Sequence, residues 1–349
     1  MDYQNAPQKQ HHKDHSHTHN NPADVGGPAT KSSMAALASV SNPAAAERYL
    51  VFYNDNNTQL ACAQGDTLTT GSPLYDYTSA ASADVPVGDM ANPSSLAAVL
   101  FDSMVCVYGV FNGVTAGDLL ICRLSPGFDV LNLVGSPPLA ATGSSSIAAC
   151  SDGGENGTLF YLTKDTKQIS QVYGITLPGT QATSSRVPID LMVNPTSYLG
   201  SAYGTLATQP ANSYVAVQAA EDNTIFVFSR HSEVSCPIQE SPGMDNTPIS
   251  CVFVGKYLVV YFFGPIGTGR QPNAPPLCRA VSDDLTGFVF NHLDEAPTPN
   301  SFTQLTAIPI PGPGNNGAGT VILSYVQASS NQLVSWTDSL EGFTDGKKL

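Results

Sequence analysis

The feature that most constrains this chain is a unit of three short strands that recurs six times. The unit is clearest at 212–240, where an alternating run at 214–219 is followed by a turn and by the run 224–229. Such alternation indicates strands, and two to five polar residues between two runs indicate a hairpin. A chain that repeats one unit in this way folds as an array of supersecondary units, so its 349 residues need not form separate domains.

Most of the six units combine a first strand rich in small residues with a hairpin of β-branched and aromatic residues. The predicted strands are 34–42, 48–55 and 59–64; 95–102, 104–111 and 118–124; 145–152, 158–165 and 168–175; 214–219, 224–229 and a short strand after 233; 248–254, 256–263 and 277–283; and 302–310, 320–327 and 332–339. Three or four strands at a period near 50 residues predict propeller blades. The expected fold is therefore all-β, a six-bladed β-propeller over 34–349. A two-sheet sandwich would leave the six similar units unexplained.

The first 33 residues form a separate region. They contain almost no apolar side chain, and five of the seven histidines of the chain lie among them, at 11, 12, 15, 17 and 19. Such a segment cannot offset the entropy of folding, so we predict a disordered His-rich tail over 1–33. It has no apolar core of a secretory signal, and the seven cysteines contain no CxxC pair. We therefore expect a cytoplasmic protein with reduced thiols.

The net charge of the chain limits the classes of partner that can be expected. The formal net charge is −14, with only 14 lysines and arginines. Nucleic acids and anionic membrane surfaces both select Lys and Arg, so neither is an expected partner. No stretch has the length and apolar character of a membrane-spanning helix.

The densest polar cluster outside the tail is the loop 230–233. His231, between Arg230 and Glu233, suits a general acid or base near neutral pH. A solvated hairpin tip is the alternative. From the predicted strand order this loop joins the second and third strands of its unit, so it should share a face with the connectors 180–210 and 284–301.

Two further arginines and one histidine complete the polar candidates. Arg270 in the loop 264–276 and Arg186 in the connector 180–210 suit the anchoring of an oxyanion by charge-assisted hydrogen bonds. His292 and His231 are the histidines outside the tail, so a metal site with several His ligands is not expected. The sequence contains no GxSxG, GxxxxGK[ST] or HExxH motif. One GxGxxG string, at 312–317, leads into a predicted strand instead of a helix, so we expect no cofactor.

The strand pairs YLVFYNDNNTQLACAQ and TLFYLTKDTKQISQVYG, each after a small-residue strand, resemble the blades of the fungal fucose-specific lectins, which have six blades. The resemblance covers about 34–343. Those lectins carry an Arg on the second strand, a Glu on the third, and a Trp or Tyr that stacks on the sugar. Here the second strands have no Arg in their cores, the third strands QLACAQ, ISQV and LVSW have no Glu, and the chain has one tryptophan, Trp336.

A propeller that lacks these sugar-binding residues is similar to the fungal hetero-Diels–Alderases of tropolonic sesquiterpene biosynthesis, which have a lectin-like fold. The similarity lies in the acidic, loop-rich and cofactor-free character of the chain. It implies dehydration of a hydroxymethyl tropolone-type phenol to an o-quinone methide, followed by stereoselective addition to a humulene-type alkene. Such a site needs an aromatic pocket, for which Tyr161, Tyr173 and Phe263 are the candidates.

Three functions therefore remain open: a cofactor-free cyclase, a glycan-binding lectin-like propeller, and a protein-interaction propeller. The cyclase predicts small-molecule partners, a tropolone-type phenol and a terpene, and one deep apolar pocket. The lectin predicts several similar shallow sites between blades. A homodimer is one possible oligomeric state.

Overall fold

The computed structural model describes residues 36–340 with gaps at 46–47, 56–58, 67–74, 79–89, 92–94, 113–118, 126–128, 132–145, 165–168, 178–183, 240–241, 270–271, 302 and 311–318, together with 343–344 and 347–348. The predicted tail 1–33, Arg270 and the GxGxxG string lie outside the described residues. The described residues contain no helix long and apolar enough to cross a membrane.

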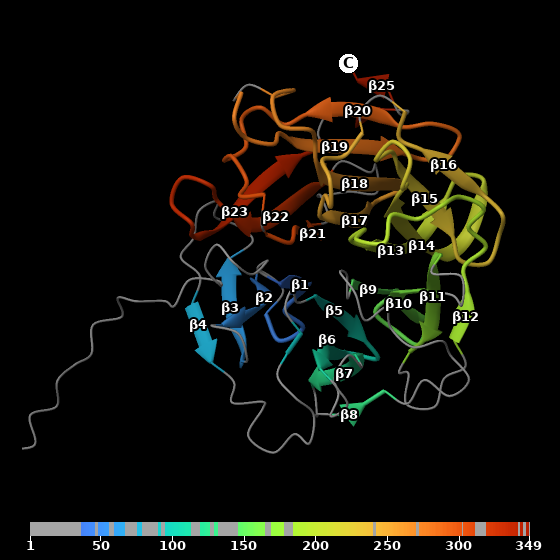
Figure 1. The fold of residues 1–349 in the computed structure, drawn as a ribbon. Helices are drawn as coiled ribbons and strands as arrows, with labels where there is room; N and C mark the ends of the chain where they lie inside the picture. Colours follow the sequence, from blue (N-terminus) through green and yellow to red (C-terminus); the bar gives the residue numbers. More distant parts are fainter. Residues whose placement is uncertain are drawn as a thin grey trace, which may run out of the picture.

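Six antiparallel sheets surround one axis, which confirms the predicted six-bladed propeller (Figure 1). Strands within each sheet follow the chain order from the axis outward. The blades are β1 (Leu37–Ser41), β2 (Arg48–Asp55), β3 (Gln59–Asp66) and β4 (Tyr75–Thr78); β5 (Leu96–Phe101), β6 (Met104–Asn112), β7 (Leu119–Ser125) and β8 (Asp129–Val130); β9 (Ile147–Ser151), β10 (Gly157–Lys164), β11 (Ser170–Thr176) and β12 (Ser184–Arg186); β13 (Gly200–Leu206), β14 (Gln209–Gln218), β15 (Ile225–Ser229) and β16 (Ser235–Pro237); β17 (Ile249–Val254), β18 (Tyr257–Phe263), β19 (Leu277–Ser282) and β20 (Val289–His292); and β21 (Thr306–Ile310), β22 (Thr320–Val326) and β23 (Leu333–Ser339). A separate short hairpin, β24 (Phe343–Thr344) and β25 (Lys347–Lys348), follows.

The fourth blade corrects the sequence prediction. Its innermost strand is β13, whereas the run 214–219, predicted as the first strand, belongs largely to the second strand β14. The sequence of β13, GSAYGTL, is dominated by small and polar residues and carries little of the β-branched signal of a strand. With β13 in place, the inner strands begin at 37, 96, 147, 200, 249 and 306, which is a more regular spacing than the predicted one.

This correction moves the loop 230–233 to the other face of the propeller. The loop joins the third and fourth strands, β15 and β16, and not the second and third. We call the face that carries the loops between strands 1 and 2 and between strands 3 and 4 the 1–2 face, and the opposite one the 2–3 face. The predicted connectors 180–210 and 284–301 also contain strands, namely β12, all of β13, the start of β14, and β20.

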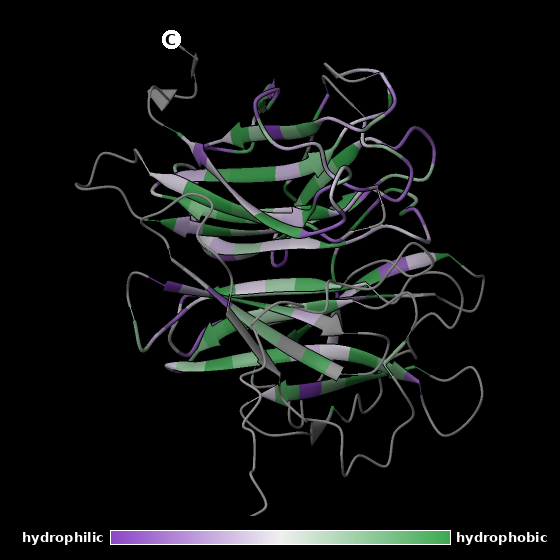
Figure 2. Ribbon diagram, turned by 90° about the vertical axis from the view of Figure 1, so that its left-hand side faces the viewer, coloured by the Kyte–Doolittle hydropathy of each residue, from purple (hydrophilic) through white to green (hydrophobic). Residues whose placement is uncertain are grey.

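The hydrophobic core lies between neighbouring blades, and each of its six clusters takes residues from two blades. Green apolar positions recur along the strands of Figure 2, and purple ones concentrate in the connections. Every blade has a fully buried tyrosine on its second strand, at 49 and 53, 108, 161, 214, 257 and 261, and 325. All seven cysteines are free thiols, as predicted.

The ring closes through side chains. In the described residues no sheet combines strands from both ends of the propeller. Instead, the Oε1 atom of Gln304, just before β21, accepts hydrogen bonds from the backbone N–H of Leu37 at 2.8 Å and of Leu96 at 3.3 Å, and its Nε2 donates to Ser95 Oγ at 3.1 Å. Gln304 therefore joins the sixth blade to the first and second blades.

Replacing Gln304 with alanine is expected to lower the free energy of unfolding by about 2–4 kcal/mol, because two buried backbone N–H groups lose their acceptor. Urea unfolding of the full chain measures the change. Gln332→Ala, at an exposed side chain, is the matched control and should change stability by less than about 0.5 kcal/mol. Equal midpoints for the two variants would contradict this role of Gln304 in closure.

Candidate functional site

A cavity of about 310 Å³ opens on the axis at the 1–2 face. Each of the six inner strands contributes a run of consecutive residues to its wall. The lining residues are 39–41, 98–100, 149–151 with 152–153 of the following turn, 201–203, 251–253 and 307–309. A narrower cavity of about 120 Å³ lies on the axis at the opposite end, where the inner strands begin. The wider cavity is at the lower end of the volumes typical of small-molecule sites.

The wider cavity has aromatic and hydroxyl groups on its wall. Tyr203 and Phe253 are its aromatic lining residues, and both also pack on the cores between blades. Ser39, Ser41 and Ser151 line it as well, whereas the Ser201 hydroxyl is buried. Rings of this kind orient an apolar or planar ligand, and hydroxyls donate to or accept from its polar atoms. Desolvation raises the pKa of Tyr203, and the charge of the nearby Asp152 carboxylate raises it further. The phenol of Tyr203 is therefore protonated at neutral pH.

The carboxylate of Asp152 at the rim is already engaged in its own turn. Its Oδ1 accepts hydrogen bonds from the backbone N–H of Gly154 at 2.8 Å and of Asn156 at 3.2 Å, and its Oδ2 accepts one from Asn156 Nδ2 at 2.6 Å. The Asn156 side chain and these backbone donors hold the pKa of Asp152 below its usual value. Asp152 is therefore ionised at neutral pH and shapes the rim.

Beside this cavity, a buried guanidinium lies between the third and fourth blades. Arg230 follows β15 directly, and its Nη1 donates to Thr158 Oγ1 at 2.6 Å. Its Nη2 donates to Thr176 Oγ1 at 3.1 Å and to the Gly174 carbonyl at 3.4 Å. Thr158 Oγ1 in turn hydrogen bonds to Ser213 Oγ at 2.8 Å. Gly174 makes room for the guanidinium, because a Cβ there would lie 3.1 Å from Nε.

Burial changes the pKa values of the titratable groups around Arg230. Desolvation raises the pKa of Cys150, which lines the cavity and lies near Arg230, to about 12, so its thiol is neutral. Burial also lowers the pKa of Arg230, although a guanidinium stays charged in proteins. Partial burial lowers the pKa of His231, and the neighbouring Arg230 charge lowers it further. Its imidazole is therefore neutral at pH 7.

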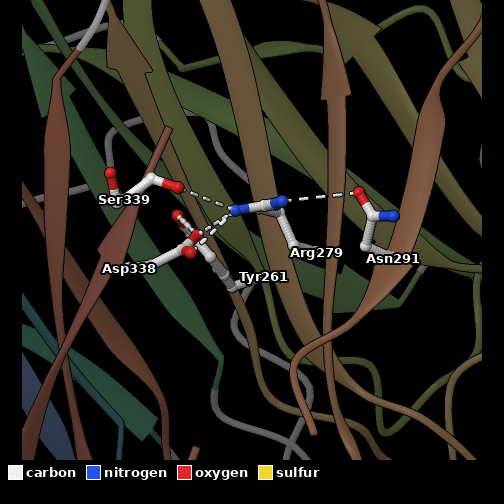
Figure 3. A network of polar contacts seen from close by, with 5 residues as sticks. All are labelled: Tyr261, Arg279, Asn291, Asp338 and Ser339. Atoms are coloured by element: carbon white, nitrogen blue, oxygen red, sulfur yellow. Dashed lines mark hydrogen bonds and ion pairs between the residues drawn. The ribbon is translucent and has the colours of Figure 1, made fainter. Parts of the chain in front are cut away.

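A second buried arginine has a different environment. Arg279 on β19 donates through Nη1 to both carboxylate oxygens of Asp338 on β23, at 2.7 and 2.8 Å (Figure 3). Tyr261 donates its hydroxyl to Asp338 Oδ2 at 2.8 Å, while Arg279 also donates to Asn291 Oδ1 and to the Ser339 carbonyl, each at 3.4 Å. Burial and the Asp338 charge raise the pKa of Tyr261 well above its usual value. This neutralised network joins the fifth and sixth blades.

The structure places the predicted polar site residues in different regions. Arg230, His231 and Glu233 share the 1–2 face of the fourth blade, where Arg230 is buried and the other two are exposed. Arg186 is exposed on the outer strand β12. His292 is half-buried at the end of β20 that leads to the 2–3 face, and its ring meets Phe290 edge to face at 5.1 Å. His292 is therefore not part of the Arg230 cluster.

The predicted aromatic residues belong to the cores between blades. Tyr161 is fully buried between the second and third blades, and the half-buried Tyr173 packs on it with ring centroids 5.8 Å apart. Phe263 is fully buried between the fifth and sixth blades. None of the three lines either axial cavity. Sequence reasoning instead missed Tyr203, whose inner strand β13 was not recognised, and Phe253, although its strand 248–254 was predicted.

Neither described histidine forms a hydrogen bond to a serine, a cysteine or a carboxylate of the described residues. The same part of the chain contains no group of three His, Cys, Asp or Glu residues arranged to hold a metal ion.

Comparison with known proteins identifies the fold. No protein-family model matches the chain. Wall-associated proteinases of Coccidioides immitis (strain RS) and Coccidioides posadasii are 30% and 29% identical to it over 115 residues, which cover 33% of this chain. The match spans 35% of the length of each of these curated relatives, about a third.

Solved structures match over most of the chain. The fucose-specific lectin from Aleuria aurantia has a TM-score of 0.58 at 16% identity, over 89% of this chain and 93% of the lectin. AofleA from Arthrobotrys oligospora has a TM-score of 0.59 at 14% identity, over 88% and 87%. Another Aleuria aurantia lectin structure is described as a six-bladed β-propeller. The chain therefore has the fold of the fungal lectin-like propellers.

Proposed function

We propose that this propeller is a cofactor-independent cyclase that binds its substrates at the 1–2 face. The observation that carries the proposal is the 310 Å³ cavity on the axis, to which all six blades contribute and which has Tyr203 and Phe253 on its wall. One axial cavity with an aromatic wall suits a pocket that orients two reactants. The similarity to fungal hetero-Diels–Alderases supplies the reaction class: a hydroxymethyl tropolone-type phenol and a humulene-type alkene.

In the proposed reaction the tropolone-type substrate first loses water. Its acidic hydroxyl gives up a proton, the oxygen electron pair forms the o-quinone methide, and the hydroxymethyl C–O bond breaks. The released hydroxide takes up a proton, so one molecule of water leaves. His231, neutral at pH 7, is the proposed base, and the Tyr203 phenol is a proposed donor to the leaving hydroxyl. The cycloaddition then forms two bonds without a further proton transfer, and the cavity wall sets its stereochemistry.

A product assay on the purified full chain tests the proposal. An o-quinone methide precursor and a humulene-type polyene are supplied, and adduct yield and enantiomeric excess are compared with a boiled control. An adduct with a stereochemical bias is the expected result. A racemic trace equal to that of the control would reject the cyclase for these substrates.

Filling the cavity should remove this activity. Ala149 lines both axial cavities, and we expect Ala149→Phe to lower adduct formation at least ~10-fold, because the added ring occupies the space of the substrate. Ala220→Phe, at an exposed turn position, is the matched control and should retain activity. Thermal unfolding of both variants separates a blocked cavity from a misfolded chain. Equal activity of the two variants would place the reaction elsewhere.

Glycan binding is the second candidate function, and the fold of the fucose-specific lectins favours it. A glycan array with fucosides distinguishes the two functions. Binding of fucosides without adduct formation would establish the lectin and reject the cyclase. The partial match to wall-associated proteinases has no counterpart in the described side chains, where neither histidine is paired with a nucleophile.

A further inference from the structure

The buried charge of Arg230 is not matched by a negative charge. Its exposed fraction is 8%, and its described partners are two threonine hydroxyls and one backbone carbonyl, all neutral. Its Nε–H is buried without a hydrogen-bond partner in the described residues. An isolated buried cation costs free energy unless a counter-ion offsets it.

Nearby groups of the chain do not supply that counter-ion. The Cys150 thiol next to Arg230 is neutral because burial raises its pKa to about 12. No carboxylate of the described residues forms an ion pair with Arg230. The segment 178–183, which continues from the end of β11 close to the guanidinium, has the sequence PGTQAT and contains no acidic residue.

Arg279 is a buried arginine that joins two blades, and in this fold its charge is neutralised by a carboxylate. Its guanidinium has the Asp338 carboxylate at 2.7 Å, together with the Tyr261 hydroxyl as a second donor to that carboxylate. Arg230 also lies between two blades, but it directly follows the third strand of its blade, whereas Arg279 lies within β19. Arg230 has hydroxyls where Arg279 has a carboxylate. Among the described residues, the Arg230 guanidinium therefore lacks the negative charge that Arg279 has.

We infer that the interface of blades three and four is a binding site for a small monoanion with a charged oxygen, a carboxylate or an ionised phenol. The anion contacts the guanidinium edge next to Thr176, because Nη2 lies 3.1 Å from that hydroxyl and Thr176 is exposed at the end of β11. Charge-assisted hydrogen bonds from a guanidinium to such oxygens are about twice as strong as neutral ones. The Thr176 hydroxyl is available as a further donor.

The inference deepens the proposed function by assigning the charged group of the substrate, but its test needs no turnover. Titration calorimetry on the full chain uses benzoate as the carboxylate, tropolone above and below its own pKa as the ionisable phenol analogue, and benzamide as the neutral isostere of benzoate. We expect benzoate and ionised tropolone to bind at least ~10-fold more tightly than benzamide, and added salt to weaken both.

Two variants locate the site. Arg230→Gln should lose at least ~10-fold in benzoate affinity, whereas Arg48→Gln, which removes an exposed cation at the start of β2 in the first blade, should retain it. Because Arg230 has no counter-ion to lose, Arg230→Met should unfold at the same or a higher temperature than the parent chain. That result separates a binding role from a structural one, and it remains informative if Arg230→Gln folds poorly.

Several outcomes would overturn the inference: no binding of either benzoate or ionised tropolone up to millimolar concentration, binding of benzoate and benzamide with equal affinity, or unchanged affinity in Arg230→Gln. Tropolone binding without benzoate binding would restrict the ligand to ionised phenols. Benzoate binding in a chain that forms no adduct would leave the anion site in place and reject the cyclase alone.

Discussion

Replacing Asp338 with alanine is expected to destabilise the protein by about 3–5 kcal/mol, since the charge of Arg279 is then left buried without its carboxylate. The Tyr261 hydroxyl loses its acceptor in the same step. Urea unfolding, followed by tryptophan fluorescence and by circular dichroism, measures the loss. The effect is large because both partners lie between two blades, where water cannot replace the missing oxygen atoms.

The double variant Arg279→Met/Asp338→Ala should recover at least half of that loss, because it removes the unpaired charge together with its partner. An exposed ion pair provides the control. Lys256 Nζ and Asp283 Oδ2 are 3.6 Å apart at the surface, and Asp283→Asn should cost less than about 1 kcal/mol. If Asp338→Ala were no more destabilising than Asp283→Asn, the network of Figure 3 would have no role in joining the blades.

Truncation of Phe263 should have a comparable effect. Its ring is fully buried between the fifth and sixth blades and meets the ring of Tyr325 edge to face, with centroids 6.2 Å apart. We expect Phe263→Ala to lower the free energy of unfolding by about 3–5 kcal/mol through lost burial and a new cavity. Phe263→Leu keeps most of the volume and should cost less than about 1.5 kcal/mol.

This pair of variants also decides the role of Phe263, which the sequence suggested as a substrate-binding residue. If it is a core residue, adduct formation per folded molecule should be the same in Phe263→Leu as in the parent chain. A loss of activity in Phe263→Leu without a loss of stability would return the residue to the substrate site. Ile266→Ala, at a side chain that is 57% exposed, is the control and should change stability by less than about 0.5 kcal/mol.

The architecture was predictable because it depends on local patterns. Continuous apolar runs such as that of β18, the small residues of β5 and β9, and six repetitions of the unit were sufficient to predict six blades. The strand β13 was missed because its small residues pack where blades converge, and their sequence carries little strand signal. One missed strand then shifted the strand count of that blade and placed Arg230 on the wrong face.

The site was less predictable because it depends on which neighbouring blade each side chain faces. Tyr108 on β6 faces the third blade, whereas Tyr161 on β10 faces back to the second, and both enter the same core cluster. Successive strand residues point to opposite faces, so an offset of one residue between blades reverses the neighbour. Sequence patterns identify the buried tyrosine of each blade but not its direction, and the charge partners of Arg279 and Arg230 differ for the same reason.

The way in which Gln304 closes the ring determines where the propeller can open during unfolding. Because no ladder of backbone hydrogen bonds crosses from the last blade to the first in the described residues, these two blades can separate without the loss of any sheet. Opening at that junction breaks the hydrogen bonds of Gln304 and exposes the apolar cluster that the two blades share, while opening elsewhere also strains a covalent connection. The backbone N–H of Leu37, which donates to Gln304, should therefore exchange with solvent through partial opening events, before the ring unfolds as a whole.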